Sequence, residues 1–435
     1  MLAPSGSIHV PTGHAVDVLP AALAAGAAAH PSTPLTFRGP TGVWQVSLAE
    51  IHERALRVAT GLAAIGIREG DVVAVQLPGS LATAVAHAAV LLRGAVLLPL
   101  LSTTGAADTR SALQRSGASA LITTAWRSHD ALRGRRASDG PSRLRRVIAV
   151  SGTWPAAGVP SDAVDWAALE AFRPLRPDAV VLPDDPGVLV RTHGAGEAKG
   201  VVHTHRSVLS EVATLHTRVW RGSSRNTHLD PFPPGHVAGL TALLDALVHG
   251  TSLVLLERWN ADAALELIHG RRVTSSAGTP AQLMALLDAA ESDERGVGTL
   301  TDYLVGRGPV PPGLLERADR AGVIVCRAYG SVEHPTVTAG TASMPPDKRA
   351  TTDGRPMPGN EVRIVDAEGG VLGAGHEGEI QTRGPDRFLR YWLPEPGEPD
   401  LTTDGWLRTG DVGRLDAEGF LTVTGRAGSA LTRVA

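Results

Sequence analysis

The chain has 435 residues, of which 43% are hydrophobic and 20% are charged, and its formal net charge is −3. This length and composition describe a globular chain that can bury a large core and divide into two or three compact lobes. The small negative charge gives no general attraction to nucleic acid or to an anionic membrane. Small molecules or another protein are therefore the expected partners.

The cysteine content and the lack of long apolar runs indicate the cellular compartment in which the chain is expected. The single cysteine, Cys326, lies in the apolar stretch "GVIVCRAYG", so the sequence excludes an internal disulfide framework. No apolar run approaches the ~20 residues of a membrane span. No charged segment precedes the alanine-rich stretch near the N-terminus, as a secretory signal requires. We therefore expect no membrane span and a reducing, cytoplasmic location.

The first part of the chain alternates helical and extended patterns. Residues 1–33 have no clear periodicity, which predicts a loose tail or a short helix at "LPAALAAGAAAH". Next, "LAEIHERALRVATGLAAIG" and "SLATAVAHAAVLLRG" have helical apolar spacing, whereas "DVVAVQL" and "AVLLPL" are typical of short buried strands. This alternation indicates parallel sheets covered by helices on both faces.

The same pattern resumes at "GVLVRTH" and continues through "TSLVLLE", "QLMALLDAA" and "GVIVCRAYG". From about residue 352 it changes to short strands joined by the turns "DAEGG" and "DAEGF", which predict an antiparallel sheet. The expected fold class is α/β, with two parallel-sheet lobes and a small β-rich subdomain. The expected ranges are 34–180 and 181–351 for the lobes, 352–426 for the subdomain and 427–435 for a hinge remnant.

One loop has the composition of a phosphate-binding loop. "RTHGAGEAKG" (191–200) combines small residues with Lys199 just before an apolar run. Such loops hold phosphate through backbone N–H groups, a lysine ammonium and, usually, hydroxyl groups. Only Thr192 supplies a hydroxyl here. The residues alone leave three interpretations open, namely a working nucleotide loop, a damaged one, or a simple turn.

Six motifs in order carry a family resemblance. They are "GEAKGVVHTHRSVLSE", "PFPPGHVAGL", "RAYGSVEHPTVT", "TDGRPMPGNEVRIVD", "GEIQTRGP" and "DGWLRTGDVGRLDAEGFLTVTGR". Each is weak alone, but together they resemble the large N-terminal domain of the AMP-forming acyl-CoA synthetase and adenylation-domain family over roughly residues 35–426. In that family a carboxylate attacks the α-phosphate of ATP, pyrophosphate leaves, and a thiol, usually that of CoA, takes the acyl group. The resemblance therefore implies ATP or AMP, Mg²⁺, CoA and a carboxylic acid substrate.

The resemblance also implies roles for individual residues. Lys199 would lie near the phosphates, Glu333 would bind Mg²⁺, Tyr329 would stack on adenine, and Asp411 would hold the ribose with Arg426 nearby. His236 would line the acyl site, although a histidine among prolines and glycines is as often a packed loop residue. The expected nucleotide contacts are Thr192, Gly194, Gly196, Tyr329, Gly330, Ser331, Asp411 and Arg426. The expected acyl contacts are His236, Val237, Gly239, Gly278 and Gly306.

The chain departs from the family pattern where hydroxyl groups face phosphate. The family loop reads approximately Ser-Gly-Thr-Thr-Gly-x-Pro-Lys-Gly, and counting back from Lys199 places His193 at a glycine and Gly194 and Ala195 at the threonines. A one-residue gap would align Gly194 with the glycine, and both registers lose a hydroxyl. Val332 replaces the threonine of "YGxTE", and Arg307 replaces a small residue. Losing two hydrogen bonds of about 1.5–3 kcal/mol each weakens phosphate or transition-state binding by on the order of 10²–10⁴-fold.

The last motif also departs from the family. "GRAGSALTRVA" lacks the aspartate of the family hinge "GRxxDxIK", beyond which relatives carry a small C-terminal domain with a catalytic lysine. We therefore expect a truncated synthetase whose adenylation and thioester formation are impaired or depend on a partner that supplies this domain. The alternative is a non-catalytic scaffold that keeps the fold and an AMP or acyl site. Retention of Lys199 and Glu333 favours an enzyme.

Overall fold

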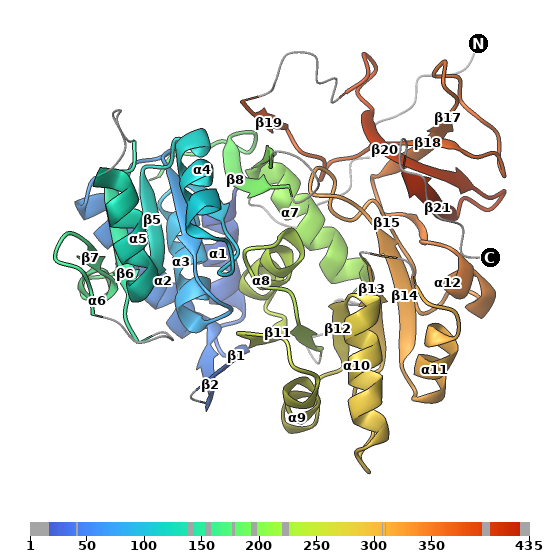
Figure 1. Ribbon diagram of the computed structural model, residues 1–435, viewed down its shortest axis with the longest axis horizontal. Coiled ribbons are helices and arrows are strands. Elements are labelled where there is room, and N and C mark those ends of the chain that lie inside the picture. The colour runs from blue at the N-terminus through green and yellow to red at the C-terminus, as the bar shows by residue number, and fades with distance from the viewer. Residues whose placement is uncertain are drawn as a thin grey trace.

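Figure 1 shows a computed structural model of the chain. The described residues are 17–40, 42–136, 143–152, 158–175, 179–192, 198–219, 226–306, 308, 310–393 and 401–426.

The helices begin where the sequence provides caps. Ser47 accepts a hydrogen bond from the backbone N–H of Glu50, and Thr204 and Thr279 each form a reciprocal capping box. The helices are α1 (Leu19–Ala29), α2 (Leu48–Ala64), α3 (Leu81–Leu92), α4 (Ala106–Ser116), α5 (Ala125–Arg136), α6 (Trp166–Glu170), α7 (His205–Thr214), the π-helix η1 (Leu215–Val219), α8 (Val237–His249), α9 (Ala261–Arg271), α10 (Pro280–Glu291), α11 (Leu314–Arg320) and α12 (Pro346–Thr351).

The described strands form three sheets. In spatial order, the nine-stranded sheet contains β16 (Arg355–Pro356), β15 (Thr338–Ala339), β14 (Ile324–Tyr329), β13 (Asp302–Val305), β12 (Ser275–Gly278), β10 (Thr227–Asp230), β11 (Ser252–Leu256), β1 (Pro34–Gly39) and β2 (Gly42–Ser47). The eight-stranded sheet contains β19 (Arg390–Trp392), β9 (Gly200–Thr204), β8 (Pro186–Arg191), β4 (Val96–Pro99), β3 (Val72–Gln76), β5 (Ala120–Thr124), β6 (Arg146–Val150) and β7 (Val164–Asp165). The four-stranded sheet contains β17 (Glu361–Val365), β18 (Gly378–Arg383), β20 (Leu407–Leu415) and β21 (Leu421–Arg426).

Parallel pairing dominates the centres of the two large sheets, whereas antiparallel pairing forms both ends of the nine-stranded sheet and one end of the eight-stranded sheet. In the eight-stranded sheet β3 pairs in parallel with β4 and β5, while β9 pairs antiparallel with β8 and β19. All ladders of the four-stranded sheet are antiparallel. The expected fold class, two α/β lobes and a small β-rich subdomain, is confirmed.

Helices cover both faces of each large sheet, and the strand sequences show why. Leu253 and Leu255 of β11 pack into a core that also contains α1, α2, α3 and α8, whereas Val254 and Leu256 pack into a core with α9, α10 and α11. Successive side chains of a strand point to opposite faces, so an unbroken apolar run is needed when both faces are buried. Figure 1 shows α7 and α8 in the middle of the molecule, between the two sets of strands.

The sheets draw strands from distant parts of the chain. β1 pairs with β11, and β19 pairs with β9, so neither large sheet follows the sequence ranges expected for the two lobes. The division into folding domains stays a prediction. Helix α1 is the short helix considered for the N-terminal segment, and it is packed rather than loose because Leu19 and Leu23 are buried.

Candidate functional site

Thr192 and Lys199 close the neck of the loop between β8 and β9. The backbone N–H of Thr192 donates to the carbonyl of Lys199 at 2.9 Å, and the N–H of Lys199 donates to Oγ1 of Thr192 at 3.0 Å. This pair continues the antiparallel ladder of the two strands. The expected loop contacts Gly194 and Gly196, and the departures at His193, Ala195 and Arg307, lie outside the described residues.

Lys199 and Glu333 meet at one tyrosine. The ammonium nitrogen of Lys199 lies 5.0 Å from the ring centroid of Tyr391, within the range of a cation–π contact. The hydroxyl of Tyr391 donates to Oε1 of Glu333 at 2.7 Å. Tyr391 reaches this position because β19 pairs with β9, the strand that begins directly after Lys199. The sequence interpretation missed Tyr391, which lies between the fifth motif, "GEIQTRGP", and the sixth, "DGWLRTGDVGRLDAEGFLTVTGR".

A tight turn after β14 presents Glu333. Ser331 Oγ accepts the backbone N–H groups of Glu333 and His334 at 3.1 and 3.2 Å, and the Ser331 N–H donates to the His334 carbonyl at 2.9 Å. A Cβ at Gly330 would lie 1.7 Å from the carbonyl oxygen of Pro335, so only glycine fits there. The Val332 carbonyl is 2.8 Å from Nε2 of His203, which ties the turn to β9. The turn is therefore fixed at both ends.

Tyr329, Asp411 and Arg426 form a second cluster beside this turn. The Tyr329 hydroxyl donates to Oδ2 of Asp411 at 2.9 Å, and Arg426 lies 3.4 Å from Oδ1. Burial, with the Asp411 carboxylate beside it, raises the pKa of Tyr329, which keeps this phenol protonated. Burial also raises the pKa of Asp411, against the opposing effects of Tyr329 and Arg426, and the Glu333 charge adds to the rise. Glu333 and Asp411 thus interact electrostatically across the site.

A buried polar network lies behind Glu333. Nε2 of His334 contacts Oδ1 of Asp386 at 3.1 Å, and the side-chain amide of Asn360 donates to Oδ2 at 3.2 Å. Burial acts to raise the pKa of Asp386, but the charge and hydrogen bond of His334 hold it below its ordinary value. Burial and the nearby Asp386 charge raise the pKa of Glu211, whose Oε1 accepts from Thr336 at 2.6 Å. None of these network residues was predicted.

His236 caps the helix that begins the expected acyl segment. It is the N-cap residue of α8, and its Nδ1 accepts the backbone N–H of Ala238 at 3.1 Å. His236 is 8% exposed, and its ring stacks on Phe232 with centroids 5.7 Å apart. A Cβ at Gly239 would lie 2.5 Å from the carbonyl oxygens of Phe232 and Pro233, which explains the glycine by close backbone packing. Val237 packs at the margin of the central core.

Gly278 and Gly306 lie side by side at the ends of β12 and β13. The Gly306 N–H donates to the Gly278 carbonyl at 3.1 Å, and a Cβ at Gly278 would lie 2.0 Å from the hydroxyl of Tyr303. That hydroxyl and Oδ2 of Asp230 are buried without a hydrogen-bond partner among the described residues. Desolvation by burial raises the pKa of Asp230 to about 7. Carboxyl ends of parallel strands meet at one edge, so these groups lie on the same side as Tyr329.

The structure thus brings together several residues that the sequence predicted separately. Tyr391 contacts both Lys199 and Glu333. Asp411 contacts both Tyr329 and Arg426. The predicted residues among these come from three different motifs. Their donor set suits a nucleotide with Mg²⁺, since Mg²⁺ binds through one or two carboxylates plus phosphate oxygens. Glu333 would be that carboxylate. The binding roles of all these residues remain predictions.

No helix within the described part of the chain combines the length and apolar character that crossing a membrane requires.

Comparison with known proteins places the chain in a family. Residues 23–392 match the family model of the AMP-binding enzymes. The "4-coumarate–CoA ligase-like 4" protein of Oryza sativa subsp. japonica is 31% identical over 398 residues, which cover 88% of this chain and 70% of the rice protein. The "3-[(3aS,4S,7aS)-7a-methyl-1,5-dioxo-octahydro-1H-inden-4-yl]propanoyl:CoA ligase" of Rhodococcus jostii (strain RHA1) is 29% identical over 395 residues, covering 88% of this chain and 74% of that ligase.

Solved structures share the same fold. The inhibitor-bound N-terminal domain of FACL13 from Mycobacterium tuberculosis superimposes with a TM-score of 0.83 at 25% identity, covering 94% of this chain and all of that domain. Apo MatB from Rhodopseudomonas palustris gives a TM-score of 0.82 at 23% identity, covering 95% of this chain and 79% of MatB, and supports the fold alone. From its family match and its relatives, the chain belongs to the AMP-binding enzyme family.

Proposed function

We propose that this protein activates a carboxylic acid with ATP and Mg²⁺, forms an acyl-adenylate, and transfers the acyl group to a thiol such as that of CoA. The observation that carries the proposal is the meeting of Lys199 and Glu333 at Tyr391. Three segments far apart in the sequence supply a cation, an anion and a hydroxyl group at one place. A site for a polyanionic nucleotide needs such an arrangement, whereas a packed scaffold does not.

The proposed roles follow from the chemistry of the groups. Lys199 neutralises phosphate charge from one side, and Glu333 holds Mg²⁺, which neutralises it from the other. Tyr329 and Asp411 bind the adenosine, with Arg426 at the exposed edge of the same cluster. Tyr391 keeps the Glu333 carboxylate oriented, because its hydroxyl occupies one carboxylate oxygen and leaves the other for the metal. The bound metal supplies charge stabilisation to the transferring phosphoryl group.

The acid is proposed to occupy the region bounded by α8 and the ends of β12 and β13. His236, Val237 and Gly239 lie on the first side, and Gly278 and Gly306 on the second. Aliphatic and small residues predominate there, which suits an acyl, alicyclic or aryl carboxylate. Several relatives are CoA ligases for substrates of these kinds, as their names state.

We further propose that adenylation is slow. Val332 stands next to Glu333 and is only partly buried, and its side chain offers no hydroxyl to a phosphate. The same observation favours a second candidate function, a non-catalytic protein that binds AMP or an acyl-adenylate. Both candidates retain the adenosine cluster, which consists of Tyr329, Asp411 and Arg426. They therefore differ in turnover and not in adenosine binding.

Pyrophosphate exchange across a panel of aliphatic, alicyclic and aryl carboxylic acids tests the proposal. An enzyme shows acid-dependent exchange that Glu333→Ala abolishes, while AMP binding to that variant persists. Trapping of the acyl-adenylate and, separately, of the CoA thioester then distinguishes the two half-reactions. AMP binding without exchange on any acid would establish the non-catalytic candidate. Failure to bind either AMP or ATP would reject both.

A further inference from the structure

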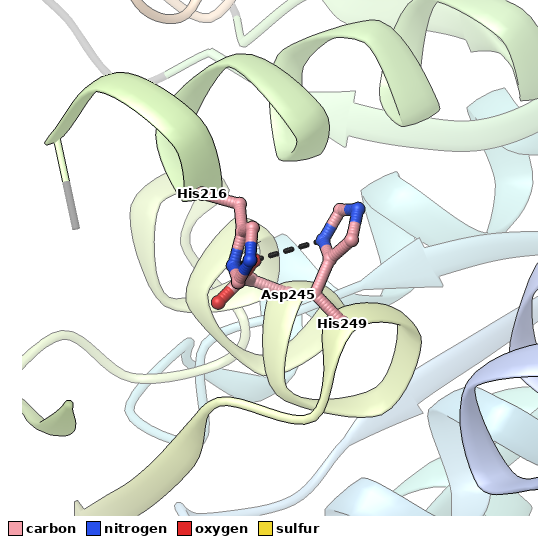
Figure 2. Close-up of side chains that lie close together, drawn as sticks. All are labelled: His216, Asp245 and His249. Atoms are coloured by element: carbon pink, nitrogen blue, oxygen red, sulfur yellow. Dashed lines mark hydrogen bonds and ion pairs between the residues drawn. The ribbon is translucent and has the colours of Figure 1, made fainter. Parts of the chain in front are cut away.

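Two histidines and one aspartate gather at a place remote from the adenosine cluster. Asp245 and His249 lie four residues apart on α8 and so share one face of the helix. His216 lies on η1, the π-helix that continues α7. Figure 2 shows the three side chains directed toward one another. One ligand atom from each lies within 4.8 Å of the other two.

The local fold holds His216 against α8. Leu215, its neighbour, is buried against Ala242 of α8, which fixes the approach of the π-helix. The rings of His216 and His249 stack with centroids 4.4 Å apart and an interplanar angle of 18°. π-helical turns are rare and occur frequently at functional sites. The turn therefore places a ligand-type side chain beside two others on a rigid helix.

The carboxylate is the unusual member of the cluster. Nδ1 of His216 and Nδ1 of His249 lie 3.0 and 2.9 Å from Oδ1 of Asp245, so both imidazoles contact the same oxygen. The side chain of Asp245 is 0% exposed, and its Oδ2 has no hydrogen-bond partner within the described ranges. A buried oxygen of an ionised carboxylate left without a partner is costly.

We propose that His216, Asp245 and His249 bind a divalent transition-metal ion, with Zn²⁺ as the best-fitting probe. Zn²⁺ takes imidazole nitrogen and carboxylate oxygen at about 2.0–2.2 Å, so ligand atoms of a tetrahedral site lie about 3.3–3.5 Å apart. The two observed nitrogen-to-oxygen separations need to lengthen by a few tenths of an ångström, and at least one of the stacked rings must rotate about its Cβ–Cγ bond, because a metal lies in the plane of each imidazole that binds it. Each neutral imidazole then carries its single proton on Nε2 instead of Nδ1.

Three protein ligands leave one position of a four-coordinate Zn²⁺ ion for a water molecule. Thr251 Oγ1 lies 3.4 Å from Nδ1 of His216, and the His216 side chain is 19% exposed, which gives water and the ion access. Two imidazoles and one carboxylate with open positions are a common set for Zn²⁺ and for non-haem Fe²⁺. A structural role follows, because the ion joins the end of α7 to the end of α8.

This site is separate from the proposed magnesium site. His249 ends α8 and His236 caps its beginning, so about 20 Å of helix separates the metal cluster from the expected acyl segment. Excess Mg²⁺ in the assay therefore keeps Zn²⁺ away from Glu333 without competing at the cluster, since Mg²⁺ prefers oxygen ligands. The inference does not depend on the proposed adenylation.

The test uses the full-length, untagged chain stripped with a chelator and titrated with Zn²⁺ in excess Mg²⁺. Wild type should bind one equivalent and gain thermal stability. His216→Gln and His249→Gln should weaken that binding at least about 100-fold, since each removes a direct ligand. His376→Gln is the matched control, because His376 is an exposed histidine outside the cluster, and it should bind as wild type does. Co²⁺ in place of Zn²⁺ should give the intense visible absorption of a tetrahedral site in wild type alone.

A measurement on the wild type alone tests the proposal even if the variants fail to fold. Zn²⁺ should protect His216 from carbethoxylation, mapped by mass spectrometry, while His376 stays reactive. The proposal is overturned if the stripped protein takes up no stoichiometric Zn²⁺, or if both folded variants bind as tightly as wild type. It is equally overturned if Zn²⁺ leaves the reactivity of His216 unchanged. In those cases the cluster is a hydrogen-bonded clamp only.

Discussion

The hydroxyl of Tyr391 donates a 2.7 Å hydrogen bond to Oε1 of Glu333, and its ring lies under the ammonium of Lys199 at 5.0 Å. One side chain therefore contacts both groups that the proposed reaction needs on opposite sides of a phosphate. This double contact depends on the pairing of β19 with β9, since that pairing sets Tyr391 opposite Val201, two residues after Lys199.

Tyr391→Phe should lower the rate of adenylation about 10- to 100-fold, because a hydrogen bond to a charged group contributes about 1.5–3 kcal/mol. The phenylalanine keeps the ring beneath Lys199, so nucleotide binding should change less than the rate. Pyrophosphate release gives the rate, and calorimetric titration with AMP gives the affinity. Tyr391→Ala, which also removes the ring, should be slower still. Equal rates for wild type and Tyr391→Phe would contradict an orienting role for the hydroxyl.

Val332→Thr should raise the adenylation rate on the cognate acid. Threonine has nearly the shape of valine and adds one hydroxyl beside Glu333, where it can neutralise charge that develops on a phosphate. A gain of about 10-fold or more is expected from one hydrogen bond to a charged group. The backbone contact between the Val332 carbonyl and His203 is unaffected by the change. Val332→Ala is the control, and a folded threonine variant no faster than wild type would show that this position is not limiting.

The fold could be predicted largely because its signals are local. The strand "DVVAVQL" became β3, because a continuous apolar run indicates a strand buried on both faces. The helical pattern at 48–66 became α2, because helical apolar spacing indicates a helix buried on one face. The assignment of strands to sheets could not be predicted. β1 pairs with β11 across more than 200 residues, and nothing in the sequence of either strand specifies its neighbour.

The candidate site was predicted only where a motif carried it. Tyr329, Glu333 and Asp411 were found through ordered motifs, but Asp386 and Tyr391 were not, because their roles arise from contacts made after folding. The same holds for His216, which lies 29 positions before Asp245. Asp245 and His249 were not predicted either, although their spacing of four residues places them on one face of a helix.

Asp386→Ala should destabilise the protein by about 3–5 kcal/mol, because it leaves His334 and Asn360 buried without their shared partner. Urea unfolding followed by fluorescence measures the change. Asp184→Ala is the matched control, since Asp184 forms an ion pair with Arg206 at the surface and its side chain is 76% exposed. That variant should change stability by less than about 1 kcal/mol. A similar small effect for Asp386→Ala would mean that the network adds little to stability.

Asp230→Asn should remove a pH dependence of stability. Burial raises the pKa of Asp230 from the ordinary 3.8 to about 7, so between these values the folded protein holds a proton that the unfolded chain releases. The free energy of unfolding should therefore fall as pH rises from about 4 to about 7 and then level off. The difference of about three pH units corresponds to about 4 kcal/mol. Asparagine is neutral throughout and can still accept the backbone N–H of Phe232, which Asp230 Oδ1 accepts at 2.9 Å.

The measurement for this prediction is chemical unfolding at pH 5 and pH 8. Asp230→Asn should be more stable than wild type at pH 8, and the advantage should shrink at pH 5, where wild-type Asp230 is protonated in the fold. Asp262→Asn, an exposed position near the start of α9, controls for the loss of one negative charge and should follow the wild-type curve. Parallel curves for wild type and Asp230→Asn would show instead that Asp230 is ionised in the folded protein. An ionised Asp230 would then need a partner for its buried Oδ2 outside the described residues.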